Sequence, residues 1–284
     1  MGPLLLSELN PAARSLFRSK PIPNSRQDRI LGALLGAALG DVMGNAISGL
    51  SKETIKDKYG DWGITSPPHN ALVSYNFSLT LFALDSLIFS TQKRHKLSVI
   101  EICNCLMKCI KEWEVVMSNP KLFHGINHLA DKSSVCTDFI KNYPLWKFTR
   151  PGSKYIKGNL SELINPLLIA VLLCANGKTT SEVAEDLAKK LGEPEFKIDV
   201  DALIAYFYHK EDITKEIKLK GLNTMREQIN SASRPDLLGM LAGFEHGAKY
   251  GIQGFKQVWY LRIDATILIE QLGWRVGRAI KSYL

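Results

Sequence analysis

The sequence predicts an all-α fold: a single compact domain built from many helices. Apolar residues recur with helical spacing along most of the chain after residue 25, whereas the alternating, β-branched runs typical of strands are scarce. The chain has 284 residues, of which 45% are hydrophobic and 23% charged, and this composition argues against disorder, collagen and coiled coil. We expect residues 1–25, which contain four prolines, to form an extended N-terminal arm, and residues 26–284 to form the helical domain.

The predicted helices follow one another with short connections. The first begins after Ser25, and the others are expected over 77–90, 98–117, 160–176, 179–191, 197–209, 211–230, 235–250 and 264–283. Thr180-Ser181-Glu182 predicts one helix start and Pro235-Asp236 another. Glycines and prolines gather in 60–72 and 142–160, so we expect long loops there.

Charge and cysteine content narrow the function classes. The net charge is +8, but the basic residues are scattered and are not interleaved with aromatic residues, so we expect an anionic partner and no nucleic acid. The longest uninterrupted apolar run, 166–175, is shorter than the roughly 20 residues of a membrane helix. The N-terminus has no apolar core for a secretory signal, and the five cysteines include no CxxC pair. We therefore expect a soluble, cytoplasmic protein without membrane contact.

The most informative segment is a glycine-rich apolar helix that starts near Arg29. Its glycines recur every four residues and so lie on one helix face: Gly32, Gly36, Gly40 and Gly44. Each costs about 1 kcal/mol of helix stability relative to alanine, so the pattern predicts very close packing of another helix. We expect that partner to be the C-terminal helix, where Gly273 and Gly277 repeat the spacing. Asp41 is a carboxylate near the end of this apolar helix and should be paired or functional.

This helix, ending in Gly40-Asp41-Val42-Met43-Gly44, resembles the start of the ADP-ribosylglycohydrolases. The family includes dinitrogenase-reductase-activating glycohydrolase and the ADP-ribosylarginine hydrolases. The resemblance implies an all-α fold with a binuclear magnesium site. It also implies an enzyme that removes ADP-ribose from modified side chains.

Three further segments are similar to family motifs in the same order. Ser74-Tyr75-Asn76-Phe77 aligns with a Thr-Asp-Asp-Thr motif that precedes a helix. Asp264-Ala265-Thr266 aligns with an Asp-x-Asp motif that leads into a helix with two glycines four residues apart. Gly158-Asn159-Leu160-Ser161 is similar to the family's glycine-rich phosphate loop, although it is one residue short.

The aligned metal-binding positions have lost most of their carboxylates. Tyr75 and Asn76 replace the first acidic pair, Thr266 replaces one member of the second pair, and Ser48 replaces a glutamate. Asp264 is the one aligned carboxylate kept outside the helix motif. Mg²⁺ requires several hard oxygen ligands, so we expect the two-magnesium site to be absent, with no cofactor and no residual magnesium binding.

Two interpretations follow, and the sequence leaves both open. In the first, the protein is an atypical hydrolase that removes ADP-ribose, most simply from arginine, with Asp264 and Asn76 as catalytic residues. In the second, it is a pseudoenzyme that binds ADP-ribose or an ADP-ribosylated protein without turnover. In both we expect a monomer and the same ligand-binding residues: Asp41, Ser48, Ser74, Tyr75, Gly158, Asn159, Ser161 and Thr266.

Overall fold

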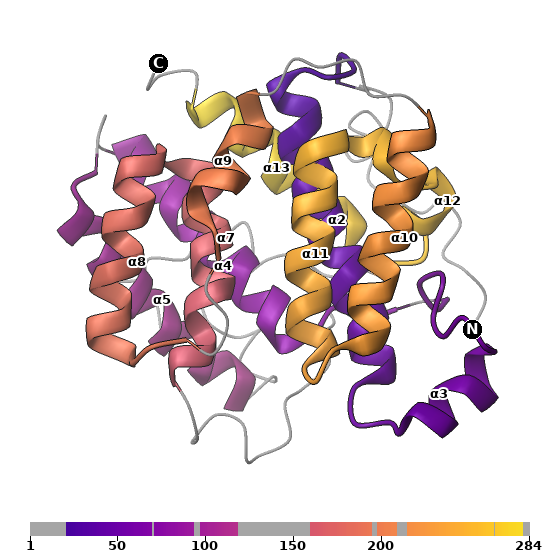
Figure 1. The fold of residues 1–284 in the computed structure, drawn as a ribbon. Coiled ribbons are helices and arrows are strands. Elements are labelled where there is room, and N and C mark those ends of the chain that lie inside the picture. Colours follow the sequence, from indigo (N-terminus) through magenta and orange to yellow (C-terminus); the bar gives the residue numbers. More distant parts are fainter. Residues whose placement is uncertain are drawn as a thin grey trace.

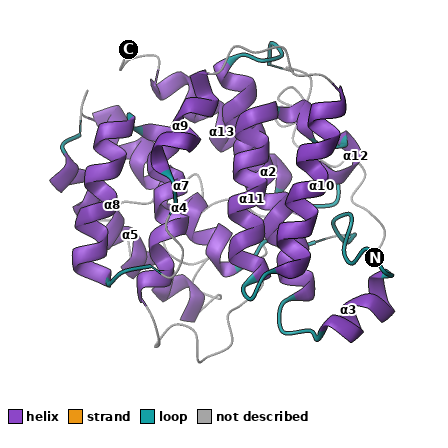
Figure 2. Ribbon diagram, viewed as in Figure 1, coloured by secondary structure: helices purple, strands orange, loops and turns teal. Residues whose placement is uncertain are grey.

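The computed structural model is a bundle of packed helices (Figures 1 and 2). It describes residues 21–69, 71–93, 97–118, 160–194, 198–208, 215–263 and 265–280. Over these ranges the regular structure is helical, and Ala71 and Ile263 form an isolated parallel bridge. The all-α prediction is confirmed. Most of the predicted N-terminal arm lies outside the described residues.

The helices and their bounds are α2 Arg26–Ile47, α3 Lys52–Tyr59, α4 Tyr75–Lys93, α5 Val99–Ser118, η4 Leu160–Leu163, α7 Ile164–Cys174, α8 Gly177–Leu191, α9 Val200–Tyr208, α10 Lys215–Ser231, α11 Pro235–Tyr250, η5 Ile252–Gly254, α12 Gln257–Tyr260 and α13 Thr266–Ile280. Helix α2 is central, with α11 and α13 packed against it. Helix α10 covers α11, while α4, α5, α7 and α8 form the other half of the bundle (Figure 1).

The glycine face of α2 packs against α11, which carries a second series of glycines with the same spacing. A Cβ atom added to Gly36 would overlap the carbonyl oxygen of Gly243, and one added to Gly40 would overlap that of Gly239. The contact is reciprocal, because a Cβ on either α11 glycine would overlap a carbonyl oxygen of α2. The two backbones therefore touch along several turns. We call this contact the glycine interface: Gly32, Gly36, Gly40 and Gly44 of α2 with Pro235, Gly239, Gly243 and Gly247 of α11.

The predicted partner of the glycine face, the C-terminal helix, was therefore wrong. Helix α13 does pack against α2, but its glycines receive side chains instead of backbone. Gly273 lies against Leu31, and Gly277 lies against Gln27, whose Nε2 donates to the carbonyl oxygen of Gly273 at 3.1 Å. Leu31 and Gln27 lie outside the glycine series, so α2 uses two different faces for α11 and α13.

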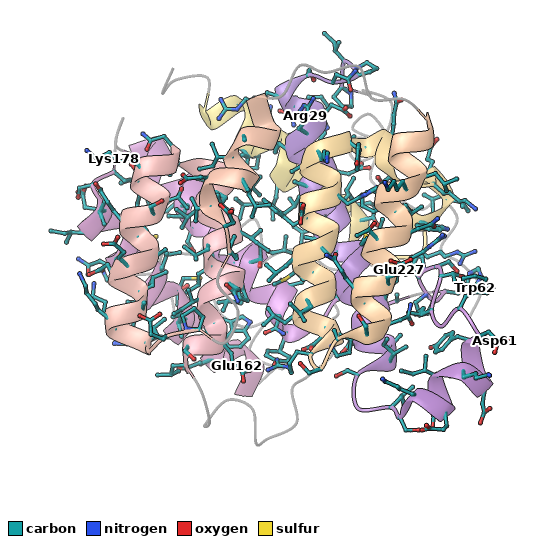
Figure 3. All side chains as sticks on the ribbon, in the orientation of Figure 1. Arg29, Asp61, Trp62, Glu162, Lys178 and Glu227 are labelled. Atoms are coloured by element: carbon teal, nitrogen blue, oxygen red, sulfur yellow. The ribbon has the colours of Figure 1, made fainter. Side chains whose placement is uncertain are left out.

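The two helices of the glycine interface are antiparallel and are also tied at one end by polar groups. Arg29, near the start of α2 and labelled in Figure 3, is buried and donates through Nη1 to the carbonyl oxygens of Lys249 at 2.9 Å and Ala248 at 3.4 Å. These carbonyls belong to the last turn of α11, where the helix leaves its acceptors unpaired. Arg29 therefore caps α11 from α2 and fixes the relative register of the two helices.

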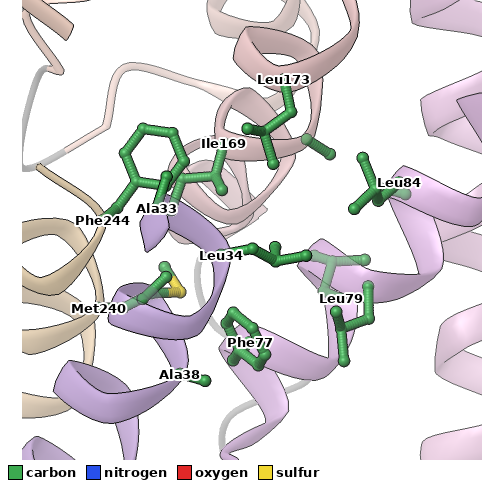
Figure 4. Packing of buried hydrophobic residues seen from close by; sticks show 14 of the residues in the cluster. Ala33, Leu34, Ala38, Phe77, Leu79, Leu84, Ile169, Leu173, Met240 and Phe244 are labelled. Carbon is green, nitrogen blue, oxygen red and sulfur yellow. The ribbon is translucent and has the colours of Figure 1, made fainter. Parts of the chain in front are cut away.

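Buried apolar side chains from both halves of the bundle form a connected core. Figure 4 shows Leu34 of α2, Phe77 of α4, Ile169 of α7 and Met240 of α11 gathered in this core. By length and composition α2 is the one described helix that could cross a membrane, and 89% of its most apolar stretch is buried inside the fold. Burial of this kind is expected of the central helix of a packed bundle.

Most helix positions were predicted well, with three differences. Helix α8 begins at Gly177, before the predicted Thr180, because the Asn176 side chain accepts a hydrogen bond from the Thr179 N–H. Helix α3 was missed: it has no buried residue, so it lacks the apolar periodicity that marks the others. The short α12 was also missed. The predicted loop at 60–72 is confirmed for its described residues, whereas the loop at 142–160 lies almost wholly outside them.

Candidate functional site

Two of the segments similar to family motifs enter their helices side by side. The Ala71 N–H donates to the carbonyl oxygen of Arg262 at 2.8 Å, and Ala71 pairs with Ile263 in a parallel bridge. Ala71 lies just before Ser74 and α4, while Ile263 lies just before Thr266 and α13. The starts of α4 and α13 are therefore neighbours, although almost 200 residues separate them in the sequence.

Asp41 is bound by the segment that precedes α4. Its carboxyl group is fully buried and accepts hydrogen bonds from the Ser74 N–H at 2.6 Å and from the Ser74 hydroxyl. Burial raises the pKa of Asp41 to about 8; the bonds from Ser74 oppose this shift and the nearby Asp236 carboxylate adds to it. At neutral pH Asp41 is therefore mostly protonated, and its role is to hold the entrance of α4 against α2.

Asn76 contacts Asp236, a residue that sequence reasoning identified only as part of a helix start. The Asn76 Nδ2 donates to Asp236 Oδ2 at 3.0 Å, and both side chains are buried. The Asn76 N–H also donates to the Ser74 hydroxyl at 3.1 Å. Asp236 reaches this position because Gly44 of α2 packs directly on Pro235, in the first turn of α11. A possible sequence signal was the second glycine series, which begins immediately after Pro235-Asp236.

Arg234 is a second residue that sequence reasoning missed. Its guanidinium contacts Asp236 through Nε and Nη2, both at 3.4 Å, and Glu162 of η4 through Nη1 at 2.9 Å. Its Nη2 also lies 3.4 Å from the Tyr75 hydroxyl. Burial disfavours the charge on Arg234, but the Asp236 and Glu162 carboxylates outweigh this effect and raise its pKa above the ordinary value. Figure 3 shows where Glu162 lies in the bundle.

These contacts join groups from α2, α4, η4 and α11, and we call the cluster the polar junction: Asp41, Ser74, Tyr75, Asn76, Glu162, Arg234 and Asp236. Within the described part of the chain, one buried polar atom of the junction has no hydrogen-bond partner, the Oδ1 atom of Asn76. Its amide orientation is fixed, since the Nδ2 atom donates to the Asp236 carboxylate. An unpaired buried acceptor is costly, so Asn76 Oδ1 is suited to a donor from a ligand or water.

The remaining predicted site residues are distributed as follows. Ser161 is buried in η4, next to Glu162. Ser48 is exposed at the C-cap of α2. The Thr266 hydroxyl donates toward the carbonyl oxygens of Tyr260 at 2.5 Å and Ile263 at 3.0 Å, so it stabilises the start of α13. Three predicted residues lie outside the described residues: Gly158, Asn159 and Asp264.

The side chains of the polar junction that could act as metal ligands do not fit a binuclear magnesium site. Asp41 is mostly protonated, while Asp236 and Glu162 are both paired with the Arg234 guanidinium. Tyr75 and Asn76 supply a phenol and an amide where a magnesium site would need carboxylates. Among the described residues, no three histidine, cysteine, aspartate or glutamate side chains are arranged to hold a metal ion.

A separate cavity of about 770 Å³ lies between α9, the end of α10 and α11. Leu203, Leu238 and Leu241 contribute apolar surface to it, and Asp199 and Glu245 contribute carboxylates. None of the residues of the polar junction lines this cavity. The site assembled from the family-like motifs is thus distinct from the cavity between α9 and α11.

Residues 22–153, somewhat less than half of the chain, match the family model for ADP-ribosylglycohydrolase. This match contains Asp41 and the Ser74–Asn76 segment, and it ends before η4 and α11. None of the curated proteins matches the chain. The helical fold and the glycine-rich α2 that ends in the Asp41 motif agree with this match, and residues 22–153 are similar to the ADP-ribosylglycohydrolase family.

Proposed function

We propose that this protein hydrolyses an ADP-ribosyl bond on a modified protein side chain, arginine in the first place, and that it does so without the usual two-magnesium site. The similarity of residues 22–153 to the ADP-ribosylglycohydrolase family supports action on ADP-ribose linkages. The observation that carries the metal-independent part is the charge balance of the polar junction, where one guanidinium is shared by two carboxylates and the third carboxyl group is protonated.

The chemistry would depend on few groups. An ADP-ribosyl bond breaks through a cation-like sugar, so one well-placed carboxylate and a positioned water can supply much of the rate enhancement. By its alignment Asp264 is the proposed carboxylate. The unpartnered Oδ1 of Asn76 would accept a hydrogen bond from that water or from a ribose hydroxyl, while Asp41 and Ser74 hold Asn76 in place.

The phosphates of the ligand would bind near η4. The proposed phosphate loop, Gly158-Asn159-Leu160-Ser161, leads directly into this 3-10 helix. Backbone N–H groups in a glycine-rich turn can surround an anion without any metal. Ser161 is buried beside Glu162, which bonds to Arg234, so this loop would connect to the polar junction through η4.

A second function is favoured by a different feature of the same cluster. Each carboxyl group of the polar junction is already engaged: Asp41 by Ser74, and Asp236 and Glu162 by Arg234. None of the three is then available to stabilise a cation-like sugar. If Asp264 does not fulfil that role, the protein would bind ADP-ribose or an ADP-ribosylated partner without cleaving the bond.

The experiment combines a binding measurement with a release assay. ADP-ribose is titrated into the full chain by calorimetry, first in EDTA and then in excess magnesium, and release is measured from an ADP-ribosyl-arginine protein. The variants are Asp264→Asn and Asn76→Ala, with Glu185→Gln, an exposed carboxylate on α8, as the matched control.

Four outcomes separate the interpretations. Equal binding in both buffers, with release that Asp264→Asn abolishes and Glu185→Gln preserves, supports the metal-independent hydrolase. Binding without any release supports the pseudoenzyme. Failure to bind ADP-ribose in either buffer contradicts both, and release that requires magnesium contradicts the metal-independent site.

A further inference from the structure

Arg234 occupies an unusual position for an arginine at a helix start. It directly precedes α11, at the N-cap, and its side chain does not cap the backbone N–H groups of that helix. Its side chain is only 15% exposed and contacts groups from three elements, Asp236 of α11, Glu162 of η4 and Tyr75 of α4. The guanidinium is therefore positioned by the junction and not by helix capping.

Without Arg234, the two carboxylates that face it would lose, in a largely buried place, the guanidinium with which both are paired. The Asp236 and Glu162 side chains are 7% and 20% exposed, and Arg234 bridges them. Like charges in such surroundings repel each other and lose hydration, and a cation placed between them offsets this cost. In this chain that cation is a guanidinium, which is permanently charged.

Beside the two carboxylates, a third side chain, that of Asn76, contributes its Oδ1 atom. It belongs to the amide that donates to Asp236, it is buried, and within the described residues it has no hydrogen-bond partner. Carboxylate and amide oxygens are the hard ligands that Mg²⁺, Mn²⁺ and Ca²⁺ prefer. Asp236, Glu162 and Asn76 thus offer the type of ligand that a single divalent cation binds, but Arg234 is already ion-paired with both carboxylates.

We propose that the Arg234 guanidinium replaces a divalent cation in this protein, and that removing it uncovers a single cation site formed by Asp236, Glu162 and Oδ1 of Asn76. This inference rests on one part of the proposed function, namely that the polar junction works without magnesium. It does not depend on whether the protein hydrolyses an ADP-ribosyl bond. The positive charge that relatives would obtain from magnesium is here part of the polypeptide, so it cannot be removed by a chelator.

The test is a manganese titration. Binding is measured as the decrease of the free Mn²⁺ signal in electron paramagnetic resonance. Arg234→Met removes the charge and keeps the apolar length of the side chain, whereas Arg234→Lys keeps a positive charge and is the matched control. We expect Arg234→Met to bind one Mn²⁺ at least tenfold more tightly than the wild type or Arg234→Lys. The double variant Arg234→Met/Asp236→Asn should lose this gain.

The outcomes decide the proposal in each case. Tight Mn²⁺ binding by the wild-type protein overturns it, as does a folded Arg234→Met variant that binds no better than the wild type. If Arg234→Met does not fold in EDTA, its refolding is repeated with Mn²⁺: recovery supports the uncovered site, and no recovery overturns it. ADP-ribose binding and release are not used here, so this inference can fail while the proposed function holds.

Discussion

The glycine interface and the polar junction both involve α2 and α11 and are both largely buried, yet they are built in opposite ways. Along the glycine interface, backbone packs on backbone, and there is no space for even one additional carbon atom at Gly40 or Gly239. At the polar junction, Asp41, Asn76 and Asp236 fill the space with hydrogen-bonded side chains. The first region is specified by shape and the second by the pairing of donors, acceptors and charges.

The difference teaches how the first region positions the second. Gly44 packs on Pro235, so the glycine interface fixes where the first turn of α11 lies relative to the turn of α2 that carries Asp41. Asp236 then reaches Asn76, and Arg234 reaches Glu162. Hydrogen bonds require their partners within a few tenths of an ångström, and a rigid backbone contact can supply that accuracy.

The largest effect is expected from breaking the glycine interface. Gly40→Ala places a Cβ atom against the Gly239 carbonyl group, and backbone on both sides prevents relaxation. We expect the free energy of unfolding to fall by about 3 kcal/mol. In an open helix the same change would instead raise stability by about 1 kcal/mol. Urea unfolding followed by circular dichroism measures the difference.

The matched control for this variant is Gly177→Ala in α8. The added Cβ there would meet the end of the Ile204 side chain at 2.9 Å, which can rotate away. We expect a change within about 1 kcal/mol of the wild type. Similar losses in the two variants would mean that the close approach of α2 and α11 is not what makes Gly40 necessary.

The second prediction compares the regions through pH, because only the polar junction contains a titrating group. Burial raises the pKa of Asp41 to about 8, so between its ordinary value and pH 8 the folded chain retains a proton that the unfolded chain has released. Stability therefore falls as pH rises across this window. Asp41→Asn cannot ionise and avoids the loss. The advantage of the variant should grow by up to about 1.4 kcal/mol per pH unit.

The measurement is the free energy of unfolding of both proteins between pH 6.5 and 8. Burial lowers the pKa of His246 to about 4, so that ring stays neutral throughout this range. Burial also raises the pKa of Glu270 to about 7, but Glu270 is present in both proteins and its effect cancels in their difference. Parallel stability curves would show that Asp41 is already ionised at neutral pH.

The smallest effect is expected from loosening the polar junction at one hydroxyl. Ser74→Ala removes a donor to Asp41 and an acceptor for the Asn76 N–H, and we expect a loss of about 1–2 kcal/mol. Ser231→Ala is the control, since its hydroxyl bonds to the Glu227 carbonyl oxygen in an exposed position and should matter little. Thermal unfolding of the three proteins ranks them, and equal midpoints would contradict a structural role for Ser74.

Much of the fold was determined by local sequence patterns. Helix α11 was predicted with both its bounds, because Pro235-Asp236 begins it and apolar residues recur with helical spacing up to residue 250. The glycine series of α2 correctly indicated a very close helix contact. Helix α3 escaped prediction because a helix without buried residues leaves no periodic pattern.

Only some residues of the polar junction could be predicted from the sequence. Asp41, Ser74 and Asn76 were found from the family-like motifs, and the structure brings these three together. Arg234 and Asp236 were missed as site residues. The contact of Asp236 with Asn76 spans 160 positions of sequence, so no local pattern could reveal it. The glycine series that follows Pro235-Asp236 marks a close helix contact, but it does not by itself mark Arg234 or Asp236 as site residues.

The sequence by itself determined that the chain is helical, that one face of α2 must approach another backbone and that most carboxylates of the family motif are absent. Only the tertiary structure decided that α11 instead of α13 receives the glycine face, and that Arg234 forms ion pairs with both Asp236 and Glu162. Helix periodicity depends on neighbours within one or two turns, whereas the choice between two glycine-bearing helices depends on how all the helix faces pack at once.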